Sequence, residues 1–329
     1  MPPEACARAS LLPVAVGLLL ALGGRWCAAD GEQPAPTPST PRGRELIRDP
    51  HFRLGFQVYD PKPGKHVVTG KLQCEGCTDE PIWGLAQWHS RFSIAGAQAE
   101  DLATGGTRWA NAAKAVIIAP VGSPDADLVL RVNAREEYGD RARRQGEMWP
   151  HLLASQGLPD SPTVAEMKAL DFRVSFRLRD EEALKTPDYD PHKHAAHYQA
   201  FVTVQNLNRE SPGYGDFLWL GVPMYDDRWR IPRSFQAPDA ALQKLIYTPP
   251  GEVYTTESAH DRQWITIERD LLPLVLEALQ TAWDKGLLQD SRDLADYRLG
   301  GINLGWEVPG ILNVELQIRD LSLRAVVGE

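Results

Sequence analysis

Residues 305–323 read GWEVPGILNVELQIRDLSL and carry the strongest strand signal in the chain. After the turn at Pro309 and Gly310, apolar side chains alternate with polar ones, a period of two that indicates a strand with one buried face. The alternation shifts by one residue partway along, which predicts a β-bulge near Asp320. The apolar positions are Val314, Leu316, Ile318, Leu321 and Leu323. This stretch therefore predicts a long strand of a sandwich.

Glu307 stands out within this stretch because it follows Trp306 in an otherwise apolar environment. A carboxylate is costly to bury without a partner or a task. Glycan chemistry needs a proton-donating carboxyl group and an aromatic platform for a sugar ring, so Glu307 is the first candidate catalytic residue. The structural alternative is a carboxylate that only binds backbone amides of the next loop.

Other segments extend the strand pattern over most of the chain. The sequence predicts strands at 115–119, 128–132, 172–178, 198–204, 217–222 and 264–267, the third with an arginine face formed by Arg173, Arg177 and Arg179. Two helices are expected. One begins near residue 161 with Thr163 and Glu166 at capping-box spacing, and the other covers 270–285. Strands in bulk with one long late helix predict an all-β fold, a two-sheet antiparallel jelly-roll sandwich of the concanavalin A type.

The N-terminus has the pattern of an export signal. Residues 11–22 form an apolar run too short to span a bilayer, and small residues follow it at 27–29. We expect residues 1–29 to be a signal peptide, 30–45 a disordered linker rich in Pro and Thr, and 46–329 a single sandwich domain. The expected location is secreted or periplasmic, with no transmembrane span.

Charge and cysteines limit the other function classes. The formal net charge is −9 and no Lys/Arg run forms a basic stripe, which argues against nucleic acid as a partner. Cys74 and Cys77 are spaced CxxC in a loop-like context. A zinc site would need more thiolates and a redox centre would open a helix, so a local disulfide is predicted.

Nine of the ten tryptophans follow the predicted signal peptide, which is many for one sandwich and suggests a lined groove as well as a core. Core packing is the alternative for any one of them. Asp216, which opens an apolar strand, is the second candidate catalytic carboxylate, although it could equally cap the turn before it. The candidate substrate-binding residues are Trp306, Trp219, Trp149, His151, Trp88 and Tyr214.

Three stretches resemble the family-twelve glycoside hydrolases, which are retaining endo-β-glucanases and xyloglucanases with a jelly-roll fold. They are residues 148–152 (MWPHL), 216–220 (DFLWL) and 304–310 (LGWEVPG), in the family's order. The resemblance implies that Glu307 is the acid/base and Asp216 the nucleophile. Aligned on the strand's Trp219, the family's nucleophile position falls on Gly215, one residue before Asp216. A shift of one residue turns a strand side chain to the opposite face unless a bulge restores it.

Residues 188–197 (DYDPHKHAAH) form a competing candidate site. His192, His194, His197 and Asp190 could hold a metal, although their spacing matches no standard zinc motif. The aspartates would suit a structural calcium better than zinc. The alternative is a solvated loop. No other cofactor is expected.

Together these features favour a secreted polysaccharide-active protein, and first of all a glycoside hydrolase that cleaves a β-linked glycan. The expected partner is a polysaccharide or oligosaccharide. A non-catalytic carbohydrate-binding sandwich needs the same aromatic residues but no carboxylate pair. A polysaccharide lyase on the same fold would act on uronic acids and need an arginine-rich groove, which the arginine strand could provide.

Overall fold

The computed structural model describes residues 43–63, 66–74, 76–120, 122–139, 141–239 and 242–328. The predicted signal peptide and residues 30–42 of the predicted linker lie outside the described residues. Arg44–Glu45 already form a strand, β1, which pairs with β17. The described part of the sandwich therefore begins before residue 46, where the sequence placed the boundary.

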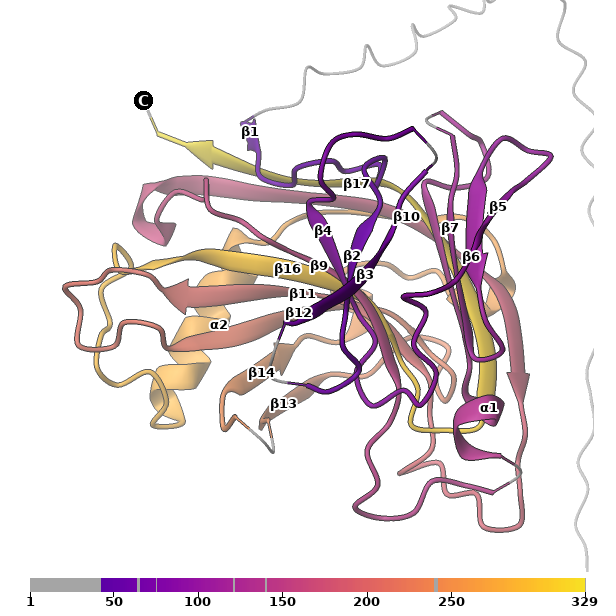
Figure 1. Cartoon of the computed structure of the whole chain (residues 1–329). Helices are drawn as coiled ribbons and strands as arrows, with labels where there is room; N and C mark the ends of the chain where they lie inside the picture. Colours follow the sequence, from indigo (N-terminus) through magenta and orange to yellow (C-terminus); the bar gives the residue numbers. More distant parts are fainter. Residues whose placement is uncertain are drawn as a thin grey trace, which may run out of the picture. The chain divides into compact units, whose positions relative to one another are not determined.

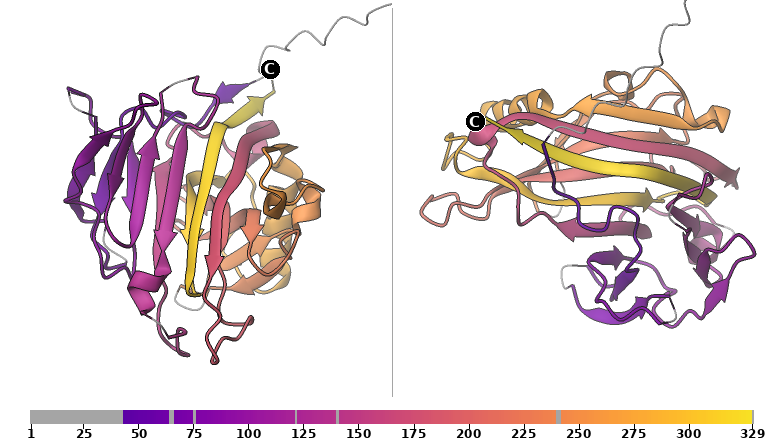
Figure 2. Two further views of the ribbon diagram at one scale, coloured as in Figure 1. Left: turned by 90° about the vertical axis from the view of Figure 1, so that its right-hand side faces the viewer. Right: turned by 90° about the horizontal axis from the view of Figure 1, so that it is seen from above.

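Two large sheets make up the fold, as predicted (Figure 1). Sheet A contains, in spatial order, β15 (Ile265–Asp270), β10 (Met167–Ala183), β17 (Leu312–Val327), β8 (Leu128–Asn133), β7 (Lys114–Ile118), β6 (Thr107–Ala110) and β5 (Ala99–Asp101), with β1 on β17. Several of these strands lie side by side in the left view of Figure 2.

Sheet B contains, in spatial order, β13 (Phe235–Pro238), β14 (Leu245–Thr248), β12 (Phe217–Asp226), β11 (His197–Asn206), β16 (Tyr297–Glu307), β9 (His151–Gly157), β4 (Trp83–Ala86), β2 (Phe56–Tyr59) and β3 (Val68–Leu72). The pairings are antiparallel except β12 with β14 and β2 with β4. This arrangement confirms the all-β sandwich.

The helical elements are few: α1 (Ala134–Tyr138), α2 (Leu272–Asp284) and the 3-10 turns η1 (Val164–Glu166), η2 (Gly251–Val253) and η3 (Ala259–Asp261). The helix α2 agrees with the prediction, and its apolar face joins the core. The helix expected from residue 161 is wrong beyond one turn. Its capping box forms, but from Met167 the alternating sequence pairs with β17, and this tertiary pairing overrides the local helix signal.

The core lies between the sheets. Inward residues of β10 such as Phe172 and Phe176 are buried, and so is Trp306 of β16. The Trp306 Nε1 donates a hydrogen bond of 2.8 Å to the carbonyl oxygen of Leu130 in sheet A. The predicted bulge is present: the β10–β17 register shifts there, and Asp320 has φ 58°. Sheet B therefore has one face packed on sheet A and one outer face.

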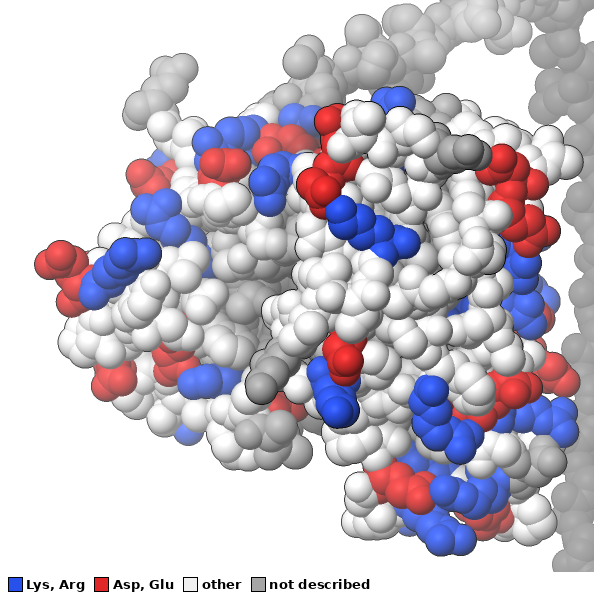
Figure 3. All heavy atoms as spheres, in the orientation of Figure 1, with Lys and Arg blue, Asp and Glu red and all other residues white. Residues whose placement is uncertain are grey.

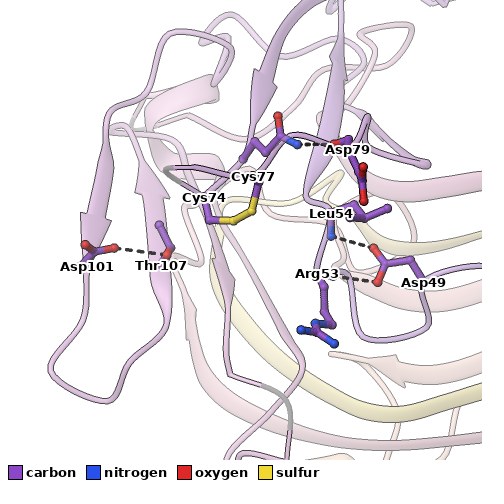
Figure 4. The surroundings of a disulfide bond; sticks show 9 residues. Asp49, Arg53, Leu54, Cys74, Cys77, Asp79, Asp101 and Thr107 are labelled. Atoms are coloured by element: carbon purple, nitrogen blue, oxygen red, sulfur yellow. Dashed lines mark hydrogen bonds between the residues drawn. A yellow bond between two sulfur atoms is a disulfide. The ribbon is translucent and has the colours of Figure 1, made fainter.

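The predicted disulfide between Cys74 and Cys77 is present in the connection from β3 to β4, with the Cα atoms 5.6 Å apart (Figure 4). The figure also shows the Asp49 carboxylate, which accepts hydrogen bonds from the backbone N–H groups of Arg53 and Leu54. The disulfide closes one short loop and does not join distant parts of the fold.

Candidate functional site

A row of ionisable side chains crosses the outer face of sheet B. The strand registers pair Asp226 (β12) with His197 (β11), His197 with Glu307 (β16), and Glu307 with His151 (β9). The residue next to each in its strand is buried: Tyr225, Tyr198, Trp306 and Leu152. Because side chains alternate along a strand, the four ionisable groups share the outer face. Four adjacent strands thus bring together an acid, a histidine, an acid and a histidine.

Glu307 is held at the centre of this row. The Trp149 Nε1 donates a 3.2 Å hydrogen bond to the Glu307 Oε2, and the His151 Nε2 lies 3.6 Å from the same oxygen. The Glu307 side chain is 21 % exposed. Among the described residues nothing donates a hydrogen bond to the Glu307 Oε1. The carboxyl group is therefore oriented through one oxygen, and the other remains available to a ligand.

Trp149, a predicted substrate-binding residue, contacts Glu307 and two further side chains. The Arg143 guanidinium lies 5.2 Å from the centre of the Trp149 ring. The His151 ring stacks against the Trp149 ring, with the two ring centres 5.9 Å apart. These neighbours hold the indole in place. We infer that Trp149 orients Glu307 through its N–H group, with its ring already in contact on both sides.

Asp226 is the second carboxylate of the row. The Arg228 Nε and Nη2 donate to its two oxygens at 2.8 and 2.7 Å. Burial alone would raise the pKa of the Asp226 carboxyl, but these hydrogen bonds and the nearby positive charges hold it below its ordinary value. Asp226 therefore stays ionised. It lies two strands from Glu307, which corresponds to about 10 Å between the Cα atoms.

His197 separates the two carboxylates. Its Nε2 lies 3.0 Å from the Arg228 Nη2 and 3.7 Å from the Asp226 Oδ2. Burial lowers the pKa of His197, although the charges of Asp226 and Glu307 oppose this shift. The imidazole is therefore neutral near pH 7 and can accept a hydrogen bond from Arg228.

The turn that carries Asp226 and Arg228 is braced from sheet A. The His260 Nε2 lies 3.1 Å from the Asp226 carbonyl oxygen and 3.2 Å from that of Trp229. The His260 Nδ1 lies 3.4 Å from the Glu181 Oε2 of β10. The interaction with Glu181 raises the pKa of His260. A charged imidazole thus ties the end of β12 to the facing sheet.

Aromatic side chains continue from the other end of the row. The ring centroid of Trp88 lies 6.1 Å from that of His151 and 6.1 Å from that of His66, and His66 lies 4.9 Å from Tyr59. The Trp88 Nε1 is buried without a hydrogen-bond partner among the described residues, as is the His151 Nδ1. Both nitrogens are enclosed by the protein, so these two rings belong to the packed wall next to Glu307.

The loop that carries Trp88 is anchored by a buried ion pair. The Lys114 Nζ donates to the Ser90 Oγ, and the Glu137 Oε2 accepts a 2.8 Å hydrogen bond from the Arg91 N–H. Lys114 and Glu137 lie 3.7 Å apart, with side chains only 1 % and 3 % exposed. Burial lowers the pKa of Lys114 to about 8, although Glu137 opposes this shift. The pair fixes the loop next to His151.

The outer face of sheet B is hollowed. Figure 3 has the orientation of Figure 1, and it shows a depression between the body that carries β11, β12 and β16 and the lobe that carries β2 and β3. Both basic and acidic side chains lie on its rim. Glu307, at the centre of the row, is the last residue of β16.

Asp216 does not join Glu307. It precedes Phe217, which pairs with Gln205, whereas Glu307 pairs with His197 at the other end of β11. The eight residue steps of β11 from His197 to Gln205 correspond to about 26 Å along the strand. Asp216 instead forms an ion pair with Lys244. The predicted pairing of the two carboxylates in one groove is therefore not found, because the strand that Asp216 opens carries it to the opposite end of the sheet.

Three predicted substrate-binding residues also lie elsewhere. Trp306 is fully buried between the sheets, so it offers no platform to a ligand. Trp219 is on the outer face but pairs with Thr203, six residues along β11 from His197, and Tyr214 is exposed in the loop before β12. Trp149 and His151 lie beside Glu307, and Trp88 lies next to His151.

The histidines of residues 188–197 do not converge on a metal. The His194 Nδ1 accepts a hydrogen bond from the Asp190 N–H at 2.8 Å, and its Nε2 lies 2.7 Å from the Arg143 carbonyl oxygen. His192 is exposed, Asp190 pairs with Lys193, and His197 belongs to the row on sheet B. Among the described residues no group of three or more His, Cys, Asp or Glu side chains could hold a metal.

Asp226 and Arg228 were not predicted as site residues. His197 was predicted only as a metal ligand. A usable signal was present: Asp226 and His197 end and begin two apolar strands that a short antiparallel connection could bring level with each other. The strand register that also brings Glu307 level with these residues could not be predicted from the sequence.

No family model and no curated protein matches the chain. Solved structures resemble it over most of their own length at low identity. The endoglucanase Cel12A from Rhodothermus marinus is 14 % identical over 70 % of this chain and 97 % of that one, with a TM-score of 0.36. The family 12 xyloglucanase from Bacillus licheniformis is 8 % identical over 70 % and 97 %, with a TM-score of 0.39.

The family 11 xylanase from Neocallimastix patriciarum is 9 % identical over 70 % of this chain and 95 % of that one, with a TM-score of 0.34. In the described part of the chain, no helix is long and apolar enough to cross a membrane. The resemblance to family-twelve glycoside hydrolases that the sequence suggested is thus found again among solved structures.

Proposed function

We propose that this protein is a glycan-cleaving enzyme, a glycoside hydrolase that acts on an uncharged β-linked glycan on the outer face of sheet B. One observation carries the proposal. Glu307 is held by Trp149 through one carboxylate oxygen, and a second carboxylate, Asp226, whose pKa is lowered by Arg228, lies in the same row. Glycosidases use two carboxylates on either side of the scissile bond.

Glu307 is the proposed proton donor to the glycosidic oxygen. Its Oε1 accepts no hydrogen bond from the described residues, so it can carry the proton towards a leaving group. Asp226 is the proposed base, or the fixed negative charge, opposite it. The two Cα atoms lie about 10 Å apart with His197 between them, a separation that favours an indirect attack through water over direct attack by a carboxylate. The expected outcome is inversion at the anomeric carbon, unlike the retaining family that the sequence resembles.

The sugar would be held by the groups that follow His151. The rings of Trp88, His66 and Tyr59 form an aromatic surface that suits the apolar faces of sugar rings. An uncharged, hydroxyl-rich chain fits these surroundings better than a uronate polymer. We also propose that residues 1–29 direct secretion of the protein. Secretion would bring it into contact with such polymers.

The test is hydrolysis by the purified protein of β-glucan, xyloglucan and xylan, with uronate polymers in parallel. New reducing ends should appear, and Glu307→Gln should lower the rate by a factor of about 10² to 10⁴, the usual contribution of a general acid. Asp216→Asn is the matched control: it also neutralises a carboxylate on sheet B, but about 26 Å along the strands, and it should retain full activity. NMR of the first product should show the inverted anomer.

Three results would contradict the proposal. Full activity in Glu307→Gln would exclude this residue. An ultraviolet-absorbing unsaturated product would mean a lyase, the alternative that the position of the arginine strand on the other sheet disfavours. Retardation of the protein in a gel that contains the glycan, without any cleavage, would mean a binding module.

A further inference from the structure

The arginines that alternate along β10 lie far from Glu307. Arg177 pairs with Gln317 of β17, while the next residue, Phe176, is buried between the sheets. Arg177 therefore lies on the outer face of sheet A, and Glu307 on the outer face of sheet B. The arginine face has no part in the proposed catalytic row.

Arg177 and Arg319 flank one tryptophan. The Arg177 guanidinium carbon lies 4.9 Å from the centre of the Trp264 ring, and that of Arg319 lies 4.1 Å from it. Contacts of a guanidinium with an indole face are favourable and restrict the long side chain. The two positive groups are therefore fixed next to each other on the sheet before any ligand arrives.

Little negative charge compensates these groups. The Arg177 Nε and Nη2 both donate to the Gln317 Oε1, a neutral acceptor, at 2.9 and 2.7 Å. Within the described residues, no carboxylate lies within ion-pair distance of Arg177 or Arg179. The Arg319 Nε lies 3.7 Å from the Asp320 Oδ2, and it is buried without a hydrogen bond.

The charges of these arginines act on one another. Burial and the positive charges of Arg179 and Arg319 lower the pKa of Arg177, and the negative charge of Asp125 only partly opposes this. Uncompensated positive charge is notable in a chain with a formal net charge of −9. Such a cluster gains stability when an anion binds.

Arg173 shows the difference on the same strand. It forms an ion pair with Glu268 of the neighbouring strand β15. Its guanidinium is thus already paired with a carboxylate, while Arg177 and Arg179 are not and Arg319 has only the 3.7 Å contact with Asp320. The strand itself provides a control for the effect of removing one positive charge from this face.

We propose that Arg177, Arg179, Arg319 and Trp264 form a binding surface for the carboxylate or sulfate groups of an acidic glycan. Guanidinium groups bind both anions through paired N–H donors. Arg177 and Arg319 are half-buried and Arg179 is exposed, so their guanidinium groups offer hydrogen bonds beside one aromatic ring, a combination that suits a sugar polymer. The surface would tether the protein to acidic polysaccharide while the outer face of sheet B remains free.

The experiment measures retardation of the purified protein in native gels that contain polygalacturonate, heparin or neutral dextran. We expect retardation by at least one acidic polymer at low salt, none by dextran, and a loss of affinity with rising salt. Arg177→Gln and Arg319→Gln should each weaken binding by a factor of about 10, in line with a lost charge-assisted contact. Arg173→Gln should change it less than about twofold, because Glu268 already pairs with that guanidinium.

The choice between polygalacturonate and heparin identifies carboxylate or sulfate as the bound group. Absence of retardation by both polymers overturns the proposal, and so does an equal loss of binding in Arg173→Gln and Arg177→Gln. Glu307→Gln should bind the acidic polymers as the unmodified protein does. Failure of the proposed hydrolase activity would therefore leave this result unaffected, and the two proposals can fail separately.

Discussion

The buried pair of Lys114 and Glu137 allows a quantitative prediction. Their side chains are 1 % and 3 % exposed, and the Glu137 carboxylate also accepts hydrogen bonds from the Ser90 hydroxyl and the Arg91 N–H. Lys114→Met removes the cation but leaves the carboxylate buried. Removing one member of a buried ion pair costs about 3–5 kcal/mol, here because the Ser90 hydroxyl and the Phe92 carbonyl oxygen lose the hydrogen-bond donor that even a neutral Lys114 amine would supply. We expect a loss of this size in the free energy of unfolding.

Urea denaturation followed by tryptophan fluorescence measures the change. The double variant Lys114→Met/Glu137→Gln is the matched control: its amide can still accept the hydrogen bond from the Arg91 N–H but carries no charge. It should recover part of the loss. A cost below about 1 kcal/mol for Lys114→Met would refute the reasoning, since it would mean that the carboxylate is solvated or protonated at little cost.

The same pair predicts a pH dependence. Burial lowers the pKa of Lys114 in the folded protein to about 8, below the unfolded value of about 10.4. Between these values the unfolded state binds more protons than the folded state, so stability rises with pH. The penalty for burying the charged amine is present in full below pH 8 and is relieved above it. The unmodified protein should gain stability relative to Lys114→Met between pH 8 and 10 in the same urea assay.

Three other substitutions have clear expectations. Trp306→Leu should cost about 3 kcal/mol, because it leaves a cavity and an unpaired Leu130 carbonyl oxygen, as measured by urea denaturation. Gly305→Ala should lower the melting temperature strongly, since φ is +148° and the new Cβ would lie 2.1 Å from a backbone oxygen. Cys77→Ser should lower the free energy of unfolding by about 2 kcal/mol or less, because the disulfide to Cys74 closes a very short loop. A melting temperature lowered as far as that of Gly305→Ala would contradict this expectation.

The sheets could be predicted because their signals are local and repeated. Alternation along residues 172–178 and 314–323 identified the two longest strands, and the phase shift located the bulge at Asp320. Local signals failed where a partner decides the structure. The capping box at Thr163 forms, but pairing of the following residues with β17 ends the helix after one turn. Propensity is a weak prior when a long neighbouring strand is available.

The site was predictable only in part, because a row across a sheet depends on register. Glu307 was found from its costly position beside Trp306, which is a property of one strand. Its partner was sought in Asp216, which has a similar local setting, but that residue opens β12, and Asp226, which ends the same strand, lies level with Glu307. A strand of ten residues offers two ends about 30 Å apart, and only pairing with its neighbour decides which end meets Glu307. Periodicity gives the face of a side chain, whereas its position along the strand direction must come from the assembled sheet.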